Sequence, residues 1–144
     1  MRDVWFFLLS IVCLISCAST QNAVVNPAAV LPTEPLVAYV EKLGGRSADV
    51  DAHIERALIS NGIGVTADRA TSNLLVKHTD DWKWDIVMYL RGLDVQMYDA
   101  RTGTLIGSAR YSNAAFTHSY PNVGKIADEL VAKIMAGAKR TPAR

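Results

Sequence analysis

The sequence is poor in cysteine, and this excludes several kinds of chemistry. Cys13 and Cys17 are the two cysteines among 144 residues, and both lie near the amino terminus. The remainder of the chain therefore has no disulfide framework, catalytic thiol or cysteine-bound metal. Charge is nearly balanced, with 15 Lys and Arg against 14 Asp and Glu, so no basic stripe suggests nucleic-acid binding. A glycine-rich phosphate loop followed by lysine is also missing.

The chain has no apolar run long enough to remain in a membrane. Residues 4–14 are apolar except for Ser10 and follow Arg2. A spanning helix needs about twenty apolar residues, so this stretch is predicted to be a secretion signal. Residues 14–17, Leu-Ile-Ser-Cys, resemble the bacterial lipobox. That resemblance implies cleavage before Cys17 and acylation of both its sulfur and its new amino group.

This interpretation divides the chain into four parts. Residues 1–16 are the signal peptide, 17–35 a lipidated amino terminus with a flexible tether, 36–138 one folded domain, and 139–144 a basic tail. No aspartate follows Cys17, which in enteric-type bacteria implies sorting to the outer membrane, on its periplasmic face. Retention at the inner membrane is the alternative.

Two amphipathic helices are predicted. Apolar residues at helical spacing indicate a helix over residues 48–60, with Ser47 as N-cap and Asn61-Gly62 as a left-handed C-cap. A wide apolar stripe indicates a second helix from an N-cap at Asn122 to Gly137.

Strands fill much of the remaining domain and define the predicted fold class. Arg91-Gly92 is interpreted as a bulge or a turn, with the bulge preferred, and Gly103 closes a hairpin loop. The order of elements predicts an α+β fold: a two-layer sandwich with two helices on one face of a mostly antiparallel sheet of four or five strands. The other face is left open to water or a partner. The predicted strands are residues 36–40, 63–66, 73–78, 82–98 and 104–112.

Three segments carry a resemblance to a known family. WKWD (82–85), MYL (88–90) and YDARTG (98–103) resemble a family of short, uncharacterised proteobacterial outer-membrane lipoproteins. The order of elements is also similar, more loosely, to the curli-secretion lipoprotein and to the amino-terminal domain of the Tol-system β-propeller protein. The second likeness concerns the fold and implies no function. The family implies no catalytic residues.

The most unusual local feature is a pair of tryptophans flanked by acids. On an extended strand Trp82 and Trp84 share one face, while Asp81 and Asp85 share the other. One interpretation is an aromatic platform, rimmed by carboxylates, that stacks on a sugar ring or a partner side chain. The other is that the tryptophans cover the core beneath the helices. The second is favoured because the next apolar residues keep the same phase.

The loop before the second predicted helix is a further candidate contact. It carries Phe116, His118 and Tyr120, and it either meets a partner or covers the sheet edge. The three histidines show no metal-ligand spacing, so neither a metal nor another cofactor is predicted. The neighbouring aspartates are better explained as turn and edge residues than as a glycosidase pair.

The predicted function follows from the expected cellular location of the protein and from its predicted fold. The chain is expected to be a non-enzymatic periplasmic domain, held to the membrane through Cys17, that binds an envelope protein or peptidoglycan. An inhibitor or immunity-type lipoprotein that blocks a hydrolase is the first alternative, and it would project a single loop. A small glycan-active enzyme is another, and it would need a cleft with convergent polar groups.

Overall fold

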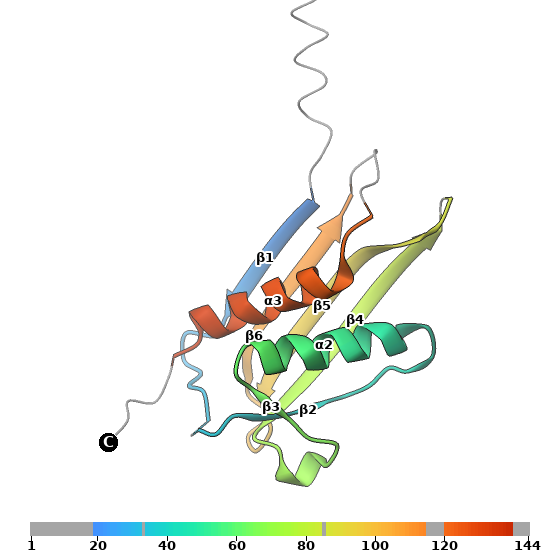
Figure 1. Ribbon diagram of the computed structural model, residues 1–144. Helices are drawn as coiled ribbons and strands as arrows, with labels where there is room; N and C mark the ends of the chain where they lie inside the picture. Colours follow the sequence, from blue (N-terminus) through green and yellow to red (C-terminus); the bar gives the residue numbers. More distant parts are fainter. Residues whose placement is uncertain (1–18, 33, 85, 115–119, 140–144) are drawn as a thin grey trace, which may run out of the picture.

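A computed structural model describes residues 19–32, 34–84, 86–114 and 120–139. Two helices lie side by side on one face of an open six-stranded sheet (Figure 1), with strand order β1-β6-β5-β4-β2-β3. Short 3-10 turns, η2 (Gly45–Ser47) and η3 (Arg69–Thr71), lie in the connections. The strands are β1 (Ser19–Val25), β2 (Val37–Val40), β3 (Gly64–Val65), β4 (Leu74–Trp84), β5 (Met88–Asp99) and β6 (Leu105–Asn113), and the helices are α2 (Ala48–Ser60) and α3 (Val123–Gly137).

The α+β class and the two helices on one face are confirmed, but the predicted sheet was wrong in two respects. It has six strands rather than four or five, and it is mixed, because β2 runs parallel to both β3 and β4. The physical reason is α2. A helix between two neighbouring strands returns the chain to its starting end, and the second strand then runs parallel to the first.

Strand β1 is the sixth strand, and it was not predicted. These residues were expected in the flexible tether, but they pair with β6 from Ser19 opposite Asn113 to Val25 opposite Gly107. Side chains add to the backbone pairing: Gln21 Nε2 donates to Glu129 Oε2 on α3 at 2.6 Å. Residues 19–25 therefore belong to the sheet and not to a tether.

The predicted long strand over residues 82–98 is also wrong, because the chain turns within it. β4 ends at Trp84 and β5 begins at Met88. The bulge is confirmed: Asp81 pairs with Gly92 while Trp82 pairs with Leu90, which leaves Arg91 as the extra residue. In the following hairpin Gly103 has φ +70°, as its predicted role requires.

Both helices have the predicted extent. Gly62 follows α2 with φ +79°, and Asn122 caps α3 by accepting from the backbone N–H of Lys125 at 3.0 Å. Ser47 does not cap α2, since its hydroxyl donates instead to Asp80 Oδ2 at 2.9 Å. No helix among the described residues is long and apolar enough to cross a membrane. Fully buried side chains between the helices and the sheet include Ile54, Leu58, Leu93, Met97, Leu130 and Ile134.

Candidate functional site

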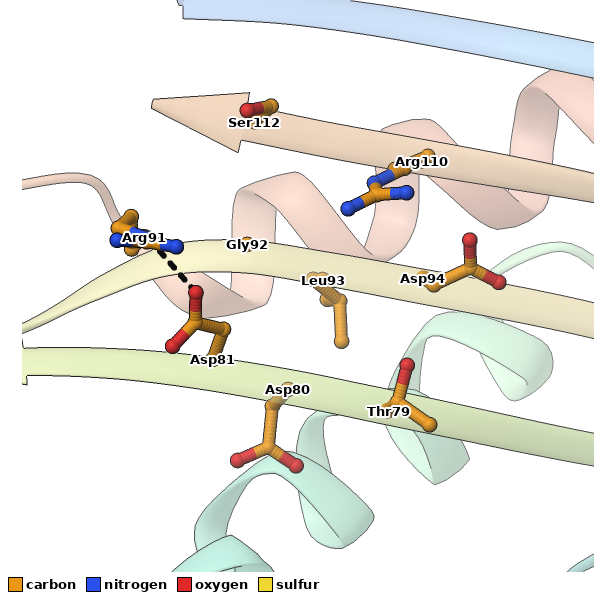
Figure 2. A pocket seen from close by; sticks show the side chains of 9 residues that line it. All are labelled: Thr79, Asp80, Asp81, Arg91, Gly92, Leu93, Asp94, Arg110 and Ser112. Atoms are coloured by element: carbon orange, nitrogen blue, oxygen red, sulfur yellow. Dashed lines mark hydrogen bonds and ion pairs between the residues drawn. The ribbon is translucent and has the colours of Figure 1, made fainter. Parts of the chain in front are cut away.

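The face of the sheet that the helices leave open carries a polar hollow at the β5 bulge. Asp81, Gly92 and Ser112 form one row across β4, β5 and β6. Since Gly92 has no side chain, the middle of this row is vacant. The resulting hollow has a volume of about 350 Å³ (Figure 2). Its lining residues are Thr79, Asp80, Asp81, Arg91, Gly92, Leu93, Asp94, Arg110 and Ser112.

Charges of both signs line this hollow. Arg91 Nε donates to Asp81 Oδ2 at 2.7 Å, and Figure 2 shows the two side chains turned toward each other. Both side chains are about half exposed, and such an ion pair contributes only about 0–1 kcal/mol. The pair can therefore separate and bind a ligand at little cost.

A second pair of opposite charges lies in the next row. Asp94 on β5 is directly opposite Arg110 on β6. Asp94 Oδ1 is buried, and it accepts no hydrogen bond from the described part of the chain. A buried acceptor without a donor is unfavourable, so a ligand that donates a hydrogen bond there would relieve this cost.

The side chains that line the hollow can recognise polar and charged groups of a ligand. Arginine guanidinium groups bind carboxylates and phosphates through paired N–H donors, and aspartates accept from hydroxyl and ammonium groups. No histidine lines the hollow. In the described ranges, no group of three or more His, Cys, Asp or Glu could hold a metal ion.

The two tryptophans on β4 have different environments. Trp82 packs partly buried against the core, and its indole Nε1 donates to Asp80 Oδ2 at 2.6 Å. Trp84 is 67% exposed, because β4 and β5 extend past the helices (Figure 1). The core interpretation therefore holds for Trp82 alone, and the pair does not form one platform. Asp81 lies on the opposite, open face, as the strand period predicted.

Only part of the predicted contact loop can be compared with the structure. Tyr120 is 55% exposed, and its ring meets the Tyr89 ring edge-on at a centroid distance of 6.4 Å. The other predicted site residues, Cys17, Asp85, Phe116 and His118, lie outside the described residues.

A buried polar cluster joins α2 to β4 on the helix side of the sheet. His78 Nε2 lies 2.7 Å from Asp51 Oδ1, and both residues are almost completely buried. Asp51 also accepts from the backbone N–H groups of Leu43 and Gly44, at 3.1 and 3.0 Å. Burial raises the pKa of Asp51, but these N–H donors and His78 outweigh burial and hold the pKa below its ordinary value. The cluster therefore joins the loop after β2 to α2 and β4.

Sequence reasoning did not find Arg91, Asp94 and Arg110 as site residues. The alternating pattern of β5 did place Asp94 on the face away from the core. The position of Arg110 beside it depends on the register between β5 and β6. That register was not predicted, because it depends on the geometry of the hairpin turn and on a register shift between Met97 and Tyr98.

Comparison with known proteins establishes a similarity of fold. No protein-family model matches the chain, and no curated protein matches its sequence. PelC from Paraburkholderia phytofirmans, solved as a dodecamer, has a TM-score of 0.56 at 15% identity over 86% of this chain and 100% of that chain.

Two further solved structures share the fold. A PelC variant from the same organism, also a dodecamer, has a TM-score of 0.54 at 15% identity over 83% of this chain and 95% of that chain. A DUF4136 family protein from Bacteroides thetaiotaomicron has a TM-score of 0.51 at 11% identity over 84% of this chain and 95% of that chain. At such identities the likeness concerns the fold alone.

Proposed function

We propose that this chain is a lipid-anchored periplasmic protein of the cell envelope that binds a polar envelope component on the open face of its sheet. Attachment at the periplasmic face of the outer membrane would be through Cys17, and the support for this is the Leu-Ile-Ser-Cys motif at residues 14–17. The single observation that carries the binding role is the hollow at the β5 bulge. Its mixed charges suit binding without catalysis and without a cofactor.

Peptidoglycan is the ligand that this hollow favours. Its sugar hydroxyls and peptide amino groups can donate to the carboxylate of Asp94, whose Oδ1 accepts no hydrogen bond from the described residues. Its peptide carboxylates can pair with Arg110 or with Arg91, once Arg91 releases Asp81. A polar strand of this kind fits a hydrophilic sheet face better than an apolar partner does.

Co-sedimentation of the lipidated protein, in detergent, with purified peptidoglycan sacculi tests this proposal. Arg110→Ala should lower the affinity about ten-fold or more, because a hydrogen bond to a charged group contributes about 1.5–3 kcal/mol. Arg101→Ala is the matched control, since it removes an exposed arginine from the turn between β5 and β6. Absence of binding by the unmodified protein, or equal losses in both variants, would contradict the proposed site.

The inhibitor alternative would use another surface. Its contact would lie on the loop before α3, where Tyr120 is exposed. Loss of a protein partner from Tyr120→Ala, with Arg110→Ala unaffected, would favour an inhibitor over a peptidoglycan-binding protein.

Self-association is a second candidate property. Strand β1 is an edge strand whose outward-facing Val24 is 69% exposed. Edge strands present unpaired backbone groups that can bind another chain, and the two PelC structures with this fold are dodecamers. Sedimentation velocity of the detergent-solubilised protein tests it: a sedimenting species several times the monomer mass is expected, and a monomer would rule it out.

A further inference from the structure

Exposed apolar side chains gather at one end of the molecule. Trp84, Ile86, Val87 and Met88, at the tip of the β4–β5 hairpin, are 67, 80, 46 and 43% exposed. We call these four residues the apolar tip. Tyr120, 55% exposed, precedes α3, and its ring meets the ring of Tyr89, the residue after Met88. Other exposed large apolar residues of the described chain are distributed singly, as is ordinary for a protein surface.

The first strand begins at this same end. β1 runs antiparallel to β6 and β6 antiparallel to β5, so the start of β1 and the start of β5 lie together. Figure 1 shows β1 beginning beside the end of the sheet from which the β4–β5 hairpin projects. Residue Ser19 is two positions after the proposed lipid attachment at Cys17. The anchor and the apolar tip therefore belong to one end of the sheet.

The register gives the relative heights of the anchor and the tip. Thr20, Ser112, Gly92 and Asp81 form one row across β1, β6, β5 and β4. Along the strands, Ser19 lies one residue beyond this row and Trp84 three residues beyond it, so Trp84 extends about 7 Å further at roughly 3.3 Å per residue.

The chain between Ser19 and Cys17 can span this difference. Two extended residues cover at most about 7 Å, so Cys17 can reach the level of Trp84. Three strand spacings, about 14 Å in total, separate the two laterally. A lipid attached at Cys17 therefore brings the bilayer surface to the apolar tip.

We propose that the apolar tip inserts into the same membrane leaflet that holds the acyl chains of Cys17. This inference rests on the proposed anchor. Tryptophan is favoured at the membrane interface, where its ring is apolar and its N–H meets water, and isoleucine, valine and methionine suit the acyl region beneath. Two attachments about 14 Å apart restrict swinging of the domain about a single lipid. The strands then stand upright on the membrane, and the open face with its hollow points sideways into the periplasm.

Fluorescence quenching by brominated lipids tests the insertion. The protein is expressed with Trp5→Phe, so that any chain that retains residues 1–16 adds no emission from Trp5. The lipidated product is reconstituted into phosphatidylethanolamine–phosphatidylglycerol vesicles with brominated acyl chains. Trp82→Phe leaves Trp84 as the emitter, and Trp84→Phe leaves Trp82. Emission of Trp84 should fall about two-fold or more relative to plain vesicles, because an interfacial side chain lies within about 5–10 Å of the acyl boundary. Emission of Trp82, which packs against the core, should change little.

A second set of variants is made in the Trp82→Phe background, so that Trp84 remains the emitter. Ile86→Ser/Val87→Ser should reduce the quenching of Trp84, whereas Ile59→Ser, an isoleucine 61% exposed near the end of α2, should leave it unchanged. Equal emission of Trp84 in brominated and plain vesicles would overturn the proposal and leave a protein partner as the occupant.

The intact mass of the same sample separates this proposal from the anchor. If Cys17 is acylated and Trp84 is not quenched, the result contradicts insertion of the apolar tip and leaves the lipid anchor supported. An unacylated chain contradicts the anchor, and quenching of Trp84 in that sample would still support insertion of the tip.

Discussion

Truncation of Trp82 should destabilise the fold, whereas truncation of Trp84 should not. Trp82 packs against the core and donates to Asp80 Oδ2, while Trp84 is 67% exposed. Replacing a fully buried tryptophan by alanine costs about 3–5 kcal/mol, and partial burial places Trp82→Ala at about 2–4 kcal/mol. Asp80 keeps one donor, the Ser47 hydroxyl, so no buried carboxylate is left without a partner. Exposed substitutions cost within about 0.5 kcal/mol, which is the expectation for Trp84→Ala.

Urea unfolding followed by far-ultraviolet circular dichroism measures this difference. Trp82→Phe is the control, since it keeps an aromatic ring and loses the N–H, and it should cost about 0.5–1.5 kcal/mol. The slope of the transition should be the same in all variants, as for a change in stability alone. Equal losses from Trp82→Ala and Trp84→Ala would refute the division of the pair, as would a larger loss from Trp84→Ala.

Three further changes probe the buried cluster, the contact between α3 and β1, and a helix cap. Asp51→Asn should lower the free energy of unfolding by about 1–3 kcal/mol at pH 7. Although burial raises the pKa of Asp51, the backbone N–H donors and His78 hold it below its ordinary value. This contribution is therefore complete above the unfolded pKa of about 3.9 and is lost as pH falls through the lower native pKa. The urea midpoints of variant and wild type should accordingly converge as pH falls below about 4, and a constant gap would contradict this. Gly137→Ala places a Cβ 2.6 Å from Val25 Cγ2 on β1. Overpacking of this kind costs about 1–3 kcal/mol, so hydrogen exchange in β1 should become faster. Unchanged exchange in β1 would contradict this prediction. Asn122→Ala should lower the thermal midpoint at a cost of about 1 kcal/mol by removing the cap of α3, and an unaltered midpoint would show that the cap is dispensable.

The helices could be predicted because their signals are local. The apolar stripe of α2 and the glycine after it, Gly62, determine its extent without reference to the rest of the fold. The same holds for the cap at Asn122 and the hairpin glycine Gly103. Ser47 is the exception, because Asp80 on β4 binds its hydroxyl, and a tertiary contact of this kind leaves no local trace.

The sheet could be predicted only in part because strand pairing is not local. β1 is polar along most of its length and carries no alternating apolar signal. It is held by pairing with β6 and by Gln21, which Lys133 Nζ also contacts at 2.7 Å. The parallel pairing of β2 with β4 likewise depends on where α2 returns the chain. The bulge at Arg91 was predictable because an arginine–glycine pair interrupts an otherwise regular strand.

The candidate site shows the same limit. Asp81 was identified from its own strand, but the hollow needs charges from three strands in register. Trp82 packs against the core, whereas Trp84, two residues further along β4, is 67% exposed. Strand period places both tryptophans on one face, and it does not say how far along that face the core extends.

The lipid anchor at Cys17 is tested most directly by the intact mass of the protein extracted from bacterial membranes. We predict a chain that begins at Cys17 and carries the added mass of a diacylglyceryl group and an amide-linked acyl chain. A chain that retains residues 1–16, or one that begins elsewhere without added lipid, would contradict the account.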